Sequence, residues 1–169
     1  MWSLALETAF GIVTIIADGV ISEAQQSRII ALSPRELSIQ QQADIAGSLS
    51  AFGDGSLIVR ITSYTLDGEA LRLAKQIAAI FEKAHIRHAD NFASVTPVDE
   101  NFIEGVNVRG SDKAFADAIA TALENIGRLA VSRKNDEIPG PAFRSAPILP
   151  DSAIAAFVFV GAKPIPTIK

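Results

Sequence analysis

The chain has 169 residues, which is enough for one main domain and one appended element. Fifteen lysines and arginines against nineteen aspartates and glutamates give a net charge of −4, which argues against a broad basic face for nucleic acid. The absence of cysteine excludes disulfides, zinc–thiolate sites, iron–sulfur clusters and cysteine nucleophiles. Apolar residues make up 49% of the chain and charged residues 20%, so a packed core is expected.

The first 32 residues contain an apolar segment. Trp2 to Ile21 is 20 residues long, the length that crosses a bilayer as a helix. Glu7 and Asp18 oppose a spanning role because a carboxylate is costly inside a bilayer, and the uncharged run Thr8–Ala17 covers only ten residues. No lysine or arginine precedes the apolar stretch, so a secretory signal is not expected. We predict a membrane-associated helix; the alternative is a buried or oligomer-forming helix of a soluble, cytoplasmic protein.

The polar residues after this segment predict a short stalk. Ser22 to Leu32 keeps good helix formers and adds polar side chains. We therefore divide the chain into an apolar helix with its stalk, residues 1–32, and a globular domain, residues 33–169. Residues 2–32 are expected to contact a membrane or a second copy of the chain, and a separate protein partner is a further option. Nucleic acid is not an expected partner.

The globular part begins with a strong helix start. Ser33 can cap, Pro34 suits the first helical position, and Glu36 completes a capping box, so we expect a helix to about residue 51. Ser56–Tyr64 is rich in β-branched residues and predicts an interior strand covered on both faces. Asp67 is the expected N-cap of an amphipathic helix over residues 70–84.

The second half of the chain repeats this pattern. Ser111 is the expected cap of a second amphipathic helix, which buries a stripe from Phe115 to Ile126. Residues 133–153 hold four of the eight prolines and predict a long surface loop. The remaining strands are predicted over Asn91–Val95, Phe102–Val108 and Ile154–Val160.

The predicted order after the first helix is β-α-β-β-α-β. This order favours the α+β class, as a ferredoxin-like sandwich with both helices on one face of an antiparallel sheet. One amphipathic helix and the N-terminal apolar helix would precede the sandwich. The alternative is a small doubly wound α/β sheet.

Several short motifs resemble the C-terminal domain of a group of uncharacterised proteobacterial membrane proteins. In that group a transmembrane segment and a helical stalk lead into such a domain. The resemblance covers about residues 33–164 and implies a shared fold, but no reaction. The matching motifs are Ser33-Pro34-Arg35-Glu36-Leu37, Asp67-Gly68-Glu69-Ala70, Leu73-Ala74-Lys75-Gln76-Ile77, Gly105-Val106-Asn107-Val108 and Val160-Gly161-Ala162-Lys163-Pro164.

Two loops together predict a candidate ligand site. We expect the first and third strands to be parallel, so that the loops leaving their C-terminal ends lie on the same edge of the sheet. Each loop feeds a helix N-terminus, whose backbone N–H groups attract anions. An anionic or nucleotide-like ligand is the hypothesis, and capping by Asp67 and Asp112 is the alternative. The candidate ligand-binding residues are Tyr64, Thr65, Asp67, Arg109, Gly110 and Ser111.

The two histidines offer a weaker motif. His85, His88 and Asp90 form H-x-x-H-x-D, which contains three potential metal ligands. They fall where a helix is expected to end, and a helix C-terminus favours histidine through the macrodipole. We therefore expect solvated helix-end residues, and neither a metal nor a cofactor.

These features favour a non-enzymatic interaction or sensing domain tethered to a membrane-associated helix. One alternative is a soluble domain, or an enzyme, that binds a small anionic ligand at the C-terminal edge of the strands. Another is a soluble oligomer held together by its N-terminal helices.

Overall fold

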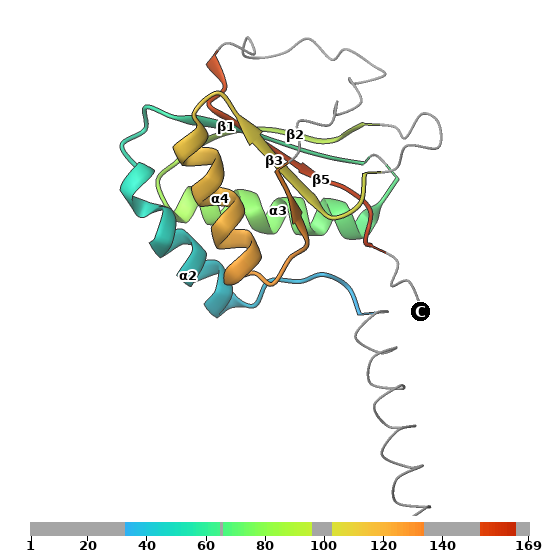
Figure 1. The fold of residues 1–169 in the computed structure, drawn as a ribbon. Coiled ribbons are helices and arrows are strands. Elements are labelled where there is room, and N and C mark those ends of the chain that lie inside the picture. Colours follow the sequence, from blue (N-terminus) through green and yellow to red (C-terminus); the bar gives the residue numbers. More distant parts are fainter. Residues whose placement is uncertain (1–32, 65, 96–102, 134–152, 165–169) are drawn as a thin grey trace, which may run out of the picture. The chain divides into compact units, whose positions relative to one another are not determined.

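The computed structural model describes residues 33–64, 66–95, 103–133 and 153–164 (Figure 1). By its internal packing the chain divides into two units, and Arg35–Pro164 contains every described helix and strand. Among the described residues, no helix has both the length and the apolar character needed to cross a membrane. The predicted membrane-associated segment, residues 2–21, lies outside the described residues, as does most of the predicted loop over residues 133–153.

The elements alternate between strands and helices along the chain. The single-turn helix η1 (Ser50–Phe52) follows the first α-helix directly. The helices are α2 (Ile39–Leu49), α3 (Gly68–Lys83) and α4 (Lys113–Asn125), and the strands are β1 (Ile58–Tyr64), β2 (Arg87–Val95), β3 (Val106–Gly110), β4 (Val131–Ser132) and β5 (Ala156–Val160).

The strands form one mixed sheet in the order β2-β1-β5-β3-β4. Strand β1 is parallel to both of its neighbours, β2 and β5, whereas β3 is antiparallel to β5 and parallel to β4. The predicted α+β class is confirmed, but a mixed sheet replaces the antiparallel sheet of the ferredoxin-like prediction. The reason is that α3 and α4 each connect two strands that lie side by side and run parallel. This produces the units β1-α3-β2 and β3-α4-β4.

The three α-helices of the described residues lie on one face of the sheet (Figure 1). One hydrophobic core joins α2, α3 and α4 to the sheet side chains that face them, among them Val59, Ile61 and Val158. The doubly wound alternative needs helices on both faces, and the two-layer arrangement differs from it. Tyr64 and Phe159 belong to a separate cluster on the other side of the sheet. We call that side, opposite the helices, the outer face.

Helix α2 begins later than the Ser33 capping motif predicts. Ser38 is its N-cap and forms a capping box with Gln41. The segment before it is held by side chains of α3: the Arg35 backbone N–H donates to Glu69 and the Leu37 N–H donates to Gln76. These N–H groups already have tertiary partners in a non-helical stretch, so the helix starts after them.

Helices α3 and α4 confirm the predicted periodicity. The apolar stripe of α3 is buried, from Ala70 to Phe81, and Asp67 caps the helix as expected. In α4 the stripe from Phe115 to Leu123 is buried. Strand β2 starts four residues before the prediction, and β4 is a short strand that we did not predict. Its two residues pair with Val106 and Asn107 of β3.

We expect Ile77→Asp to unfold the domain. Ile77 is 0% exposed in the centre of the α3 stripe, and an unpaired buried carboxylate costs several kcal/mol. That cost is comparable with the whole stability of a domain, about 5–15 kcal/mol. Urea denaturation of the full chain tests this expectation. Arg72→Asp, at an exposed position of the same helix, is the matched control and should unfold within about 0.5 kcal/mol of the parent chain. Equal loss in both variants would contradict this orientation of α3.

Candidate functional site

The two loops of the predicted composite site lie at opposite ends of the sheet. The expectation that their strands are parallel was wrong, because β5 lies between β1 and β3 and runs parallel only to β1. Ser63, at the end of β1, is level with Val160 on β5, and Val160 is level with Val106 at the start of β3. The end of β3 at Gly110 is level with the beginning of β5. The described residues of the predicted site therefore lie at two opposite ends of the sheet.

Residues of the first loop have structural partners. The Tyr64 hydroxyl accepts a hydrogen bond of 2.8 Å from the Ile103 backbone N–H, and its ring packs edge-on against Phe159 at 5.0 Å between centroids. Thr65 lies outside the described residues. The Asp67 carboxylate accepts from the N–H groups of Glu69 and Ala70, each at 3.0 Å. Asp67 therefore caps the start of α3, as the capping alternative expected.

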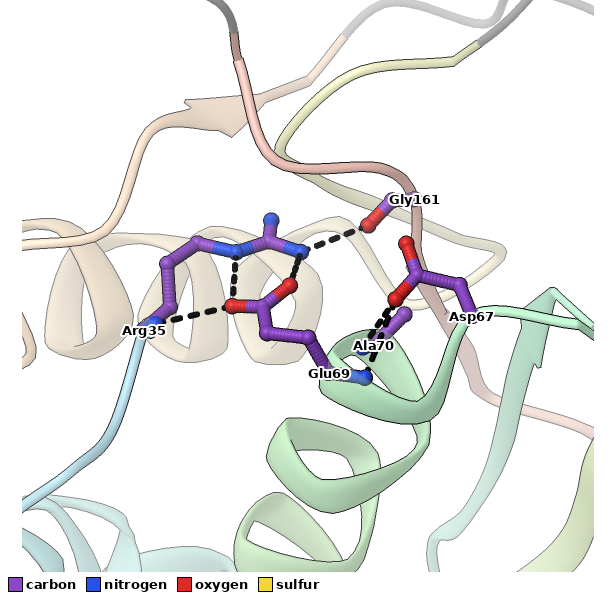
Figure 2. A network of polar contacts seen from close by, with 5 residues as sticks. All are labelled: Arg35, Asp67, Glu69, Ala70 and Gly161. Carbon is purple, nitrogen blue, oxygen red and sulfur yellow. Dashed lines mark hydrogen bonds and ion pairs between the residues drawn. The ribbon is translucent and has the colours of Figure 1, made fainter. Parts of the chain in front are cut away.

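An ion pair beside this loop joins three distant parts of the chain. Figure 2 shows the Arg35 guanidinium facing the Glu69 carboxylate, with Nε donating at 2.8 Å and Nη2 at 2.6 Å. The same Nη2 donates to the Gly161 carbonyl at 2.7 Å, which ties the segment before α2 to the end of β5. The third guanidinium nitrogen, Nη1, is buried with no hydrogen-bond partner, a cost of about 1–3 kcal/mol against the bonds that Arg35 makes.

The surroundings of Glu69 set its charge state. Burial raises the pKa of Glu69, but hydrogen bonds from the Arg35 side chain and backbone lower it by more in sum. The positive charges of Arg35 and Lys163 add to that lowering, so the pKa lies below its ordinary value of 4.5. Only 10% of the Arg35 side chain and 18% of the Glu69 side chain are exposed, so solvent screens this pair weakly. We interpret the pair as a clamp that holds the fold.

The second loop is also organised by packing and capping. Asp112, rather than the predicted Ser111, is the N-cap of α4 and accepts from the Phe115 N–H at 3.0 Å. The Ser111 hydroxyl donates a longer bond of 3.3 Å to the Ile154 carbonyl. A Cβ atom at Gly110 would collide with the backbone at Ala155, so glycine allows β3 to approach β5 closely. The N-terminus of α4 is therefore occupied by a carboxylate of the chain itself.

Arg109 lies in a row of side chains across the outer face. Phe157 of β5 is level with Arg60 of β1 and with Arg109 of β3. The guanidinium carbons of Arg60 and Arg109 lie 5.5 Å and 5.3 Å from the centre of the Phe157 ring, within the range of cation–π attraction. All three side chains are half-buried. No described residue forms an ion pair with Arg109.

Arginines dominate the charge of the outer face. Arg87 on β2 is level with Ile58 and therefore shares this side of the sheet with Arg60. None of the described positions that alternation and register place on the outer face is acidic. Those positions are Ile58, Arg60, Thr62 and Tyr64 on β1, Arg87 and Ala89 on β2, Asn107 and Arg109 on β3, Ser132 on β4, and Phe157 and Phe159 on β5.

Sequence reasoning missed Arg60, Arg87 and Phe157. Alternation within Ser56–Tyr64 was a usable signal, because it places Arg60 and Thr62 on the side opposite Val59 and Ile61. The gathering of arginines from three strands depends on the strand order. The sequence could not reveal that order, because β5 is almost a hundred residues from β1 along the chain.

The histidine motif is divided between a turn and a strand. His85 occupies the turn after α3 with a positive φ of 58°, while His88 and Asp90 lie within β2 rather than at a helix end. His88 Nδ1 is 2.6 Å from an Asp90 carboxylate oxygen, and its Nε2 is 3.6 Å from Glu82. Within the described part of the chain, no group of three or more His, Cys, Asp or Glu side chains is placed to hold a metal.

We expect the stability contributed by Glu69 to depend on pH. A carboxyl with a lowered pKa in the folded state stabilises the fold above its unfolded pKa of about 4.5, and this contribution is lost as the pH falls through the folded value. Glu69→Gln should therefore cost about 2 kcal/mol near neutral pH, because it weakens charge-assisted hydrogen bonds. Its deficit relative to the parent chain should shrink toward pH 3.

Urea denaturation at several pH values measures this deficit. Glu36→Gln, at an exposed position with no described ion pair, is the control and should show almost no deficit at any pH. A deficit for Glu69→Gln that is independent of pH would contradict the clamp.

We expect Asp112→Ala to destabilise the domain by about 1 kcal/mol, because it removes the cap of α4. Ser111→Ala should cost less, since it removes only one long hydrogen bond. Chemical denaturation of the two variants in parallel compares them. A larger loss of stability for Ser111→Ala than for Asp112→Ala would indicate that Ser111 caps α4.

Comparison with known proteins adds no relative to these observations. No protein-family model, curated protein or solved structure matches the chain. The resemblance to the proteobacterial membrane-protein domain stays a prediction.

Proposed function

We propose that the protein is a non-enzymatic interaction or sensing domain, tethered to a membrane by its N-terminal segment. The row Arg60–Phe157–Arg109 on the outer face is the observation that supports an interaction role most directly. Two guanidinium groups lie beside one half-buried aromatic ring, and arginine and aromatic side chains are enriched at protein contact sites.

The helices support the same role by covering the opposite side. They bury the inner face of the sheet, where Val59, Ile61 and Val158 are 0% exposed. On the outer face the half-buried Arg60, Phe157 and Arg109 stand on paired strands, and a binding surface on strands is positioned more accurately than one on loops. The apolar pattern of residues 2–21 supports the tether.

We expect the full chain to sediment with vesicles of zwitterionic lipid. Val13→Lys combined with Ile16→Lys should release it, because each lysine costs about 2.5–3.5 kcal/mol at the centre of an inserted helix. The matched control places the same two charges in the predicted stalk, as Gln25→Lys and Gln26→Lys, and should remain bound. A parent chain that stays in solution as a defined oligomer would favour the alternative in which N-terminal helices join copies of the protein.

A further inference from the structure

We propose that the open edge of β2 pairs with the same edge of a second copy of the chain, as two antiparallel strands related by a twofold axis at Ala89. The open edge is the side of β2 that faces away from β1, over residues 87–91. This inference goes beyond the proposed function and does not rest on the membrane tether, because the surface lies within the described domain.

The end position of β2 in the sheet is the first argument. The strand order begins with β2, so no strand of the described residues pairs with its second side. Every other residue of such a strand directs its backbone N–H and C=O groups away from the sheet, where they can pair with another chain. Arg87 is exposed and Ala89 is only half-buried, as expected where no strand lies beside them. The opposite end of the sheet offers much less, because β4 has two residues.

The open edge lacks most of the features that protect a strand from pairing. Residues 87–91 contain no proline and no lysine, and they pair with β1 in unbroken register. His88 and Asp90 lie on the helix side of the sheet, and inward charges oppose pairing because a second strand would bury them. Here the two side chains hold each other, with His88 Nδ1 2.6 Å from an Asp90 carboxylate oxygen. Neither would therefore enter an interface without a partner.

The length of the regular strand selects the register of the pair. The register between β1 and β2 shifts between Thr62 and Tyr64, so the regular part of β2 is residues 87–91. An antiparallel partner pairs with this whole segment only if the twofold axis passes through its central residue, Ala89. Alanine suits that position, because its small side chain lies directly opposite its own copy.

Charge complementarity selects the same register. With the axis at Ala89, His88 of each copy lies opposite Asp90 of the partner subunit, on the helix side of the sheet. Arg87 lies opposite position 91, where the sequence has no charge. An axis at Arg87, His88 or Asp90 would instead place identical ionisable side chains directly opposite each other, which destabilises a strand pair. The open edge is therefore self-complementary, as a twofold interface requires.

The first experiment traps the pair through a new disulfide. The chain has no cysteine, so Ala89→Cys introduces one thiol in each copy. Residues directly opposite each other on antiparallel strands have Cα atoms about 4.5–5.5 Å apart, which a disulfide can bridge. Oxidation by oxygen with copper phenanthroline should therefore convert most of the full-length variant into a covalent dimer, seen by non-reducing electrophoresis.

Arg87→Cys is the matched control, on the same edge and the same side of the sheet. In the proposed register the two copies of position 87 lie about 14 Å apart along the strands, so no disulfide should form between them. Equal cross-linking of the two variants would overturn the register, because random collision would then explain it. Absence of a cross-link at position 89 would also overturn the inference.

The second experiment separates edge pairing from other modes of self-association. Ala89→Glu should weaken self-association of the full chain by about tenfold or more, because it places two carboxylates opposite each other. The domain should tolerate this change, since position 89 is level with Arg60 on the neighbouring strand. Ala114→Glu, at an exposed position of α4, makes the same change of charge and should associate like the parent chain. Sedimentation equilibrium in a non-ionic detergent measures the masses, and thermal unfolding establishes that both variants are folded.

The outcomes separate this inference from the proposed function. A monomeric parent chain would overturn the edge pair, leave the tether untouched, and assign the open edge to a strand of another protein. An oligomer that persists unchanged in Ala89→Glu would assign self-association to residues 2–32 and overturn the inference. Cross-linking at position 89 in a chain that does not bind vesicles would support the edge pair and contradict the tether alone.

Discussion

The pairing of β5 with β1 on one side and with β3 on the other is the constraint on which the rest of the described structure depends. The units β1-α3-β2 and β3-α4-β4 each form a parallel pair, and only β5 joins the two pairs into one sheet. Ala156, Val158 and Val160 of β5 belong to the hydrophobic core that α3 of the first unit and α4 of the second unit both contact. Loss of this strand would leave two small pairs, neither of which could bury a substantial core.

The position of β5 also decides which loops lie at each end of the sheet. Because β1 and β3 run in opposite directions on either side of it, the loops after them lie at opposite ends. The Arg35–Glu69 clamp lies at the end where β1 and β5 finish, and its bond to the Gly161 carbonyl connects the segment before α2 with the strand that closes the sheet. The helix N-termini at the two ends are occupied by Asp67 and Asp112, so the polar groups that suggested an anion site stabilise the fold instead.

The same arrangement separates the charges of an acidic protein. The helices bury one side of the sheet, and the outer face carries Arg60 and Arg109 beside Phe157, with Arg87 on the edge strand β2. Composition alone argued against a broad basic face, and the net charge remains −4. A net charge is nevertheless a sum over all surfaces, whereas a partner meets only one of them. This local surface is why an interaction role on the outer face is the function we propose.

Local patterns determined the elements, and tertiary contacts determined their arrangement. The stripes of α3 and α4, the Asp67 cap and the interior position of β1 followed from the sequence, because each depends on residues a few positions apart. The start of α2 did not follow, because the Arg35 and Leu37 N–H groups bind side chains more than thirty positions away. The strand order was equally hidden, and with it the separation of the two loops and the row around Phe157. Only folding brings β5 between β1 and β3, because a strand pairs with the partners that the tertiary structure places beside it, and its own residues carry little record of which partners those are.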